Sequence, residues 1–160
     1  MIRFKHAVHE ETYRRVQDYL PDFFDDLYHD EDDGHFYVRY GTTVLEISVE
    51  AYGPKEAVVT IMSYCVQGVD VSEELMTTLL ELNHVQPFGA FSMVDNDVFF
   101  SHSMFGRDVQ PRSLLGAIAA VADVADESDD RIVDRFGGQT ALERIRDTGG
   151  RKRRVAVGQG

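Results

Sequence analysis

Hydrophobic and polar positions repeat along this chain with two periods, one of three to four residues and one of two. Between Glu10 and Leu27 the apolar residues recur every third or fourth position, which gives an α-helix one buried stripe. Pro21 is expected to kink this helix or to open a second segment, because proline lacks the N–H that a helix interior needs. The same spacing predicts a helix from about Ser72 to Asn83, and another after Pro111 that reaches Phe136 or breaks into a short successor.

Five other segments have the shorter period, which is typical of β-strands. They are His35–Tyr40, Thr43–Tyr52, Glu56–Gln67, Phe88–Val94 and Asp97–Phe105. The turns between the first three, and the Asp95-Asn96 turn between the last two, are too short for anything but antiparallel neighbours. The order helix, three strands, helix, two strands, helix therefore predicts a single-domain α+β fold with an antiparallel five-stranded sheet.

The strand from Glu56 onwards is apolar on both of its faces. Strict alternation places Ala57, Val59, Ile61 and Cys65 on one face and Val58, Met62, Tyr64 and Val66 on the other. One small domain rarely has two cores, so the second apolar face is covered by further helices or meets another chain.

We take this second apolar face as the candidate peptide-binding surface. Its predicted residues are Val58, Met62, Tyr64, Phe91, Met93, Phe99 and Phe105. Methionine and aromatic side chains make adaptable contact surfaces, as a receptor for varied peptides needs. If the two faces are assigned the other way round, the site moves to Ala57, Val59, Ile61, Ala90 and Phe100.

Length and charge narrow the classes of protein. The chain has 160 residues, which suits one domain with a core of its own. A formal net charge of −12 argues against nucleic acid as a partner, because phosphate binding needs a basic surface. The N-terminus lacks an apolar core of signal-peptide length, and no stretch comes near the roughly 20 apolar residues of a membrane span, so we expect a cytoplasmic protein that does not contact a membrane. We divide it into an N-terminal extension (1–9), a domain (10–148) and a mobile basic tail (149–160).

Charge is unevenly distributed along the chain. Seven acidic residues fall between Asp22 and Asp33, and four consecutive basic residues occupy Arg151–Arg154. The simplest interpretation of both segments is a solvated surface. The acidic segment could also attract a basic peptide, and the basic one could fold back on the acidic segment, or contact nucleic acid or an acidic partner.

Residue types that carry catalysis or bind metals do not gather in the sequence. Cys65 lies mid-strand among apolar neighbours and is expected to pack as a small hydrophobe. Alternation puts Ser101 and Ser103 on the face opposite His102, so neither serine can pair with it. Only four residues approach a metal-ligand spacing, namely His29, Asp30, Asp32 and His35. A hydrated turn is the simpler interpretation of this segment. We expect no metal, no cofactor and no enzymatic activity.

Two segments give the chain a resemblance to a known family. The chain reads L-L-E-L-N-H-V-Q-P-F-G-A-F from Leu79 to Phe91, continues in the strand Val98–Phe100, and ends a helix in Asp134-Arg135-Phe136-Gly137-Gly138. This pattern resembles the YbjN family, which is described as bacterial sensory-transduction regulators and looks like the type III secretion chaperone fold. The likeness extends from about Tyr13 to Gly138 and brings no catalytic motif. It implies a module that binds a peptide or protein segment, frequently as a homodimer.

These observations predict a non-enzymatic, chaperone-like binding module. Apolar side chains of a partner segment would be buried on the Met- and Phe-rich sheet face, with strand addition at a sheet edge as a second contact. Two alternatives stay open. The chain could be a dimeric regulatory protein that acts through one specific signalling partner, or an uncharacterised enzyme, for which the sequence shows no polar cluster.

Overall fold

The computed structural model describes residues 2–148, and its main helices and strands follow the chain order that the sequence predicts. The elements are α1 (Ala7–Tyr19), β1 (Tyr28–His29), β2 (Phe36–Tyr40), β3 (Thr43–Tyr52), β4 (Glu56–Gln67), α2 (Glu73–Val85), β5 (Ala90–Val94), β6 (Asp97–Phe105), α3 (Pro111–Phe136), β7 (Gln139–Thr140) and α4 (Ala141–Thr148). The fold is α+β with an antiparallel sheet, as expected. The tail predicted for 149–160 lies outside the described residues.

The sheet has the strand order β1-β2-β3-β4-β6-β5, and β7 pairs with the end of β4. All pairings are antiparallel. The sequence predicts five of these strands and misses β1 and β7. Each of these two has only two residues, which is too short for a period of two to be visible.

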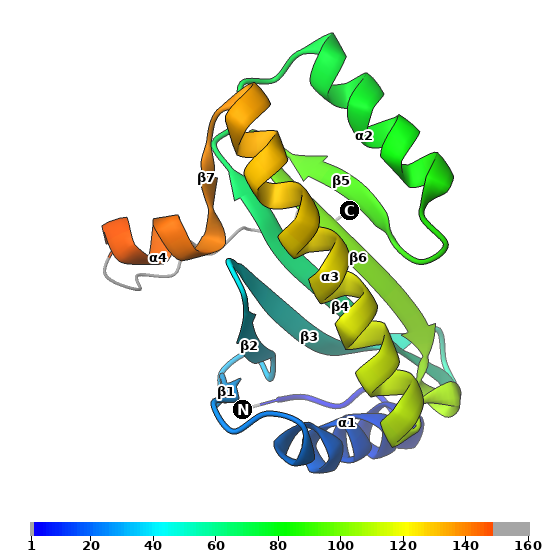
Figure 1. Cartoon of the computed structure of the whole chain (residues 1–160). Coiled ribbons are helices and arrows are strands. Elements are labelled where there is room, and N and C mark those ends of the chain that lie inside the picture. The colour runs from blue at the N-terminus through cyan, green and yellow to red at the C-terminus, as the bar shows by residue number, and fades with distance from the viewer. Residues whose placement is uncertain (1, 149–160) are drawn as a thin grey trace.

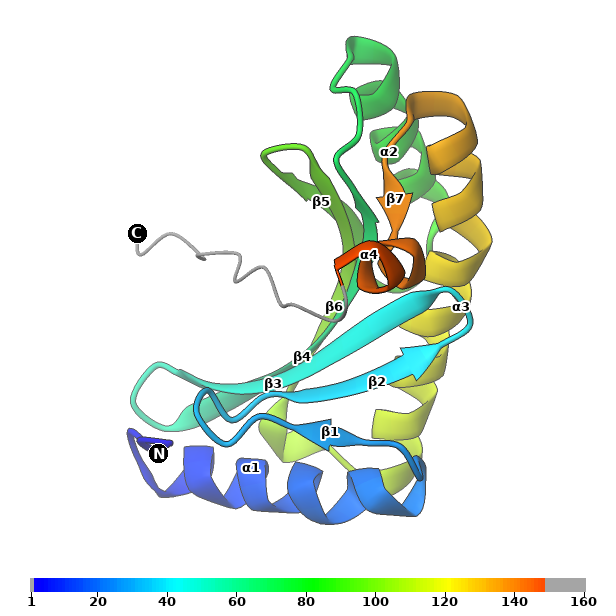
Figure 2. The same cartoon turned by 90° about the vertical axis from the view of Figure 1, so that its left-hand side faces the viewer.

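Helices α1, α2 and α3 pack on one face of the sheet, which we call the covered face. Figure 1 views the molecule from this side, with α3 lying diagonally across the sheet, and Figure 2 shows the sheet curving so that these helices lie on its convex side. The main core fills the space between them. Ala57, Val59 and Ile61 of β4 are fully buried in it, together with Val16 of α1 and Leu114 of α3.

Local sequence signals account for where most of the helices begin and end. The α1 helix starts at Ala7, three residues earlier than expected, because His6 caps it by accepting a hydrogen bond from the His9 N–H. Pro21 opens a separate turn of 3₁₀ helix, Leu20–Asp22, and does not kink α1. Ser72 caps α2 as predicted, through its hydroxyl oxygen and the Leu75 N–H.

The α3 helix is one continuous element, so of the two outcomes left open the extension is correct. It starts with Pro111 in its first turn and ends at Gly137, whose φ of +76° few side chains tolerate. No helix within the described residues is long and apolar enough to cross a membrane.

Candidate functional site

The sheet face opposite the covered face carries most of the predicted site, and we call it the open face. Five of the seven predicted residues lie there: Val58, Met62, Tyr64, Phe99 and Phe105. The β4–β6 register sets Tyr64 opposite Phe99 and Val58 opposite Phe105. The rings of Tyr64 and Phe99 are 5.6 Å apart, which confirms that the two side chains share this face. In Figure 2 this face is turned to the left, away from α2 and α3.

Phe91 and Met93 lie on the covered face, so the prediction that they share a surface with Met62 is wrong. The β5–β6 register sets Phe91 opposite Phe100 and Met93 opposite Val98, and both partners belong to the main core. Helix α2 packs over β5 on this side. Alternation relates residues within one strand, but it does not say which face of one hairpin continues which face of another.

The alternative set of site residues is mostly core. Ala57, Val59, Ile61 and Phe100 are buried beneath the helices, whereas Ala90 is exposed on the open face opposite Ser101. Val66 also differs from its predicted face, because the register shifts between Tyr64 and Val66. Such a β-bulge reverses the alternation that follows it.

A polar cluster lies on the open face beside the apolar residues, and we call it the Glu46 cluster. It consists of His35, Tyr37, Glu46, Glu50 and Tyr64. Glu46 is only 8% exposed. Its Oε2 accepts a hydrogen bond from the Tyr64 hydroxyl, and its Oε1 lies 3.2 Å from Nδ1 of His35. The other ring nitrogen of His35, Nε2, lies 3.8 Å from Oε1 of Glu50.

Mutual contacts keep the acids and the histidine of the Glu46 cluster charged. Hydrogen bonds to Glu46 and Glu50 raise the pKa of His35 to about 10. Burial favours the neutral form of Glu46, but hydrogen bonds from His35 and Tyr64 outweigh it, and the pKa of Glu46 is lowered. The His35 hydrogen bond likewise lowers the pKa of Glu50. Near neutral pH the cluster therefore holds one imidazolium and two carboxylates, so it is net negative.

The sequence contained a signal for this cluster that the site prediction did not use. Glu46 and Glu50 fall on the polar face of their strand, and the short turn at Gly53-Pro54-Lys55 leads to a register with Glu46 opposite Met62. His35 entered the sequence analysis only as a metal-ligand candidate. Alternation within each strand and the short turns between the strands are enough to group Glu46 and Glu50 with the side chains opposite them on one face of the sheet.

The metal-ligand candidates do not converge. His29 stacks on Phe36 with ring centres 4.6 Å apart and contacts the Tyr13 hydroxyl, so it faces the core, whereas His35 lies on the open face. Within residues 2–148 no group of three or more His, Cys, Asp or Glu side chains is placed to hold a metal ion.

The other residues examined for chemistry have structural surroundings. His102 lies on the covered face, near the ring of Phe88, and Ser103 on the open face hydrogen-bonds Thr60. The Cys65 thiol contacts the Ala125 carbonyl oxygen in the core, where burial raises its pKa. A raised thiol pKa disfavours the reactive thiolate.

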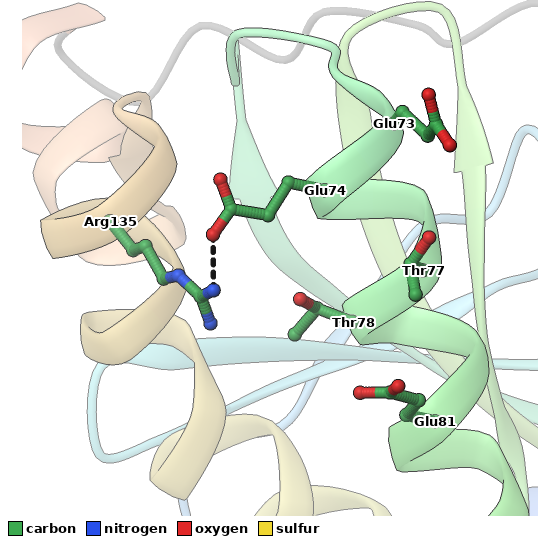
Figure 3. Close-up of a pocket in the computed structure, with 6 residues that line it drawn as sticks. All are labelled: Glu73, Glu74, Thr77, Thr78, Glu81 and Arg135. Atoms are coloured by element: carbon green, nitrogen blue, oxygen red, sulfur yellow. Dashed lines mark hydrogen bonds and ion pairs between the residues drawn. The ribbon is translucent and has the colours of Figure 1, made fainter.

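A polar groove lies between α2 and α3, on the covered side of the molecule (Figure 3). It is lined by Glu73, Glu74, Thr77, Thr78, Glu81 and Arg135. Arg135 of α3 forms an ion pair with Glu74 of α2 across it.

Comparisons with known proteins bear on the fold and the family. A family model described as T3SS (YopN, CesT) and YbjN peptide-binding chaperone 1, or TY-Chap1, matches residues 10–144. A chain in the crystal structure of the ExsC–ExsE complex is similar in structure, with a TM-score of 0.60 and 10% sequence identity, over 79% of this chain and 97% of that chain. At that identity the likeness shows the fold alone. No curated protein matches the sequence.

Proposed function

We propose that this chain, which belongs to the family of type III secretion (YopN, CesT) and YbjN peptide-binding chaperones, binds an apolar segment of a partner protein on its open face. The observation that carries the proposal is the gathering of five apolar or aromatic side chains on the sheet face opposite α1, α2 and α3. Four of them are partly exposed, whereas Phe99 is only 3% exposed. The proposal is of binding without catalysis. The structural likeness to a chain from a two-protein complex is consistent with it.

The open face offers apolar contact along β4 and β6. Val58, Met62 and Tyr64 are each partly exposed, and Phe105 is 42% exposed. Burying such side chains against a partner is favourable by about 25 cal/mol per Å² of apolar surface. Because Met62 is flexible, it can adapt to partner side chains of different shape.

The same face is chemically mixed, which refines the expectation of a Met- and Phe-rich surface. Thr60 and Ser103 lie between the two apolar ends, and the Glu46 cluster borders Met62. Glu50 projects a side chain that is 65% exposed. We therefore expect the preferred partner segment to combine apolar residues with a Lys or Arg that reaches Glu50.

An edge of the sheet supplies a second contact in this proposal. Within the described residues β5 pairs with β6 alone, and the Asn83 side chain of α2 hydrogen-bonds both the N–H and the C=O of Phe91. The remainder of the outer edge of β5 has no strand partner there. An extended partner segment adds to such an edge as a further strand.

A peptide array tests the proposal. We expect the purified protein to bind a subset of apolar peptides and the Met62→Asp variant to bind them at least about tenfold more weakly, because a buried carboxylate is costly to desolvate. Met76→Asp is the matched control, since Met76 is 47% exposed on α2, away from the open face. Full binding by folded Met62→Asp would exclude the open face as the site.

A second candidate is a dimeric regulatory protein, and one observation favours it. Large apolar side chains are exposed along α2 and the loop that follows it: Met76, Leu80, Val85 and Phe88. Leu80 and Val85 are each 69% exposed. A second copy of this chain that packs α2 against α2 would bury these residues on both sides.

A further inference from the structure

The chain itself contains a segment whose chemistry matches the open face. Residues 149–160 read G-G-R-K-R-R-V-A-V-G-Q-G, so four basic residues precede a short apolar stretch and no acidic residue occurs. This order of basic and then apolar residues is complementary to the open face, where the Glu46 cluster borders the apolar side chains of β4 and β6.

Charge and aromatic rings both suit arginine at the Glu46 cluster. Asp33 adds a further carboxylate, 4.0 Å from Nδ1 of His35, so three carboxylates face one imidazolium there. Tyr28 and Tyr37 lie beside it with ring centres 6.1 Å apart. Guanidinium groups bind carboxylates and stack on such rings. Lys5 is an opposing cation, since it helps to lower the pKa of Glu50.

The last described helix, α4, begins close to this face. The Leu142 N–H of α4 donates a hydrogen bond of 3.1 Å to the Thr42 carbonyl oxygen, directly before β3 begins. Helix α4 packs against β3, β4 and β7, and Figure 2 shows it at the edge of the open face.

The distances along the chain are compatible with contact. Glu46 is four residues along β3 from Thr42, which is about 13 Å at the rise of a strand. Arg151–Arg154 follow Thr148 by three to six residues, which is roughly 10–20 Å of extended chain. The Val155–Val157 stretch comes next in the sequence, and Met62 lies directly opposite Glu46 in the β3–β4 pair.

We propose that residues 149–160 of this chain occupy the open face when no partner is bound, with Arg151–Arg154 against the Glu46 cluster and Val155–Val157 on the apolar residues. The segment then competes with the partner segment for the same face, so this inference rests on the proposed function. Binding of a partner displaces it.

The acidic stretch Asp22–Asp33 is the competing place for the basic residues, and it fits less well. Its apolar residues Phe23, Phe24 and Leu27 pack against the main core, so it has carboxylates but no comparable surface for Val155 and Val157. The open face has both, because α1, α2 and α3 lie on the other side of the sheet.

Methionine methyl NMR on the full chain tests the contact. We compare the wild type with a variant that carries Arg151→Ser, Lys152→Ser, Arg153→Ser and Arg154→Ser. We expect the Met62 methyl resonance to differ between them, and the wild-type resonance to move to the variant position at about 1 M salt, where the Debye length is about 3 Å. The Met76 methyl on α2 is the internal control and should not respond. An identical Met62 resonance in both proteins would overturn the proposal.

Carbodiimide cross-linking gives an independent answer. Lys152 is expected to join the exposed carboxylate of Glu50 or that of Asp33 within one chain. Mixing of isotope-labelled and unlabelled protein distinguishes such links from links between chains. Links from Lys152 to Asp22–Asp26, or links only between chains, would contradict the proposal.

The peptide array separates this inference from the function on which it rests. Peptides that bind the wild type should bind the four-serine variant about three- to tenfold more tightly, since apparent affinity scales with the fraction of open faces that are free. Equal affinities together with an unresponsive Met62 methyl refute the inference but leave peptide binding intact. A responsive methyl with no bound peptide supports occupation of the face by the segment and refutes the proposed function.

Discussion

At the scale of single residues, the ionised carboxylate of Glu46 contributes to the negative charge of the open face. Its carboxylate is almost completely buried, yet hydrogen bonds from Tyr64 and His35 keep it ionised. A buried charge is tolerated only when such partners replace the lost water. Removing one partner therefore leaves the other charges of the cluster poorly compensated.

The linkage between His35 and stability gives a prediction with a definite sign. The pKa of His35 is about 10 in the folded protein against 6.5 for an ordinary histidine. Its charged contacts therefore stabilise the fold fully below pH 6.5, and this contribution is lost as pH rises toward 10. We expect His35→Gln to lower the unfolding free energy by about 1–2 kcal/mol near pH 6.

Urea unfolding at a series of pH values measures this effect. The fall in stability of the wild type between pH 6.5 and 10 should be smaller in His35→Gln. His84→Gln, at an exposed position of α2, is the control and should follow the wild type. Parallel pH profiles for wild type and His35→Gln would mean that the ion pairs do not contribute.

At the scale of elements, a second polar network holds α3 against the β2–β3 turn. Oδ1 of Asp126 accepts a hydrogen bond from the Thr42 N–H. The Thr42 hydroxyl oxygen lies 3.0 Å from the same Oδ1 and 2.6 Å from Oδ2 of Asp129. Gly41 in this turn has a φ of +55°, and a Cβ there would lie 2.2 Å from Asp126 Oδ1. A Cβ at this position would displace the Asp126 carboxylate, which accepts the Thr42 N–H, and the positive φ favours glycine there as well.

Asp129 makes this contact dependent on pH. Burial raises its pKa to about 6, against 3.8 for an ordinary aspartate, because the neutral acid is easier to bury. With the folded pKa raised, stability from this group is greatest at low pH and falls as pH rises from 3.8 to 6. A protonated Asp129 can donate to the Thr42 hydroxyl oxygen, and an asparagine amide can do the same.

We therefore expect Asp129→Asn to raise the unfolding free energy above pH 6 by about 1 kcal/mol or more. Chemical denaturation of the variant and the wild type across this range measures the difference. Asp123→Asn is the control on the same helix, because Asp123 is exposed and accepts its hydrogen bond from Tyr40. A variant less stable than the wild type at every pH would refute the claim that burying the ionised Asp129 carboxylate costs stability.

At the scale of the whole molecule, two surfaces are available to other chains. The open face lies on one side of the sheet, and the exposed residues of α2 lie on the other. Because they do not overlap, one molecule can bind a partner segment and a second copy of itself at the same time. The two candidate functions are therefore compatible, and each surface can be altered without the other.

Sedimentation of the purified protein tests self-association. If α2 mediates self-association, the wild type sediments as a dimer with twice the chain mass of 18.1 kDa, whereas Leu80→Asp sediments as a monomer with the mass of one chain. Leu115→Asp is the control, since Leu115 is 42% exposed on α3. A wild type that sediments as a monomer at high concentration would exclude the dimeric regulator in this form.

The sequence by itself determined the three long helices, the five main strands and the hairpin turns, because the period of apolar positions, Pro111, Ser72 and the short turns all act locally. It also placed Val58, Met62 and Tyr64 together, since alternation holds within one strand. Only the tertiary structure decided that Phe91 and Met93 face the core and that the bulge turns Val66 inward. These depend on the register between hairpins and on where the helices pack, and no local period contains that information.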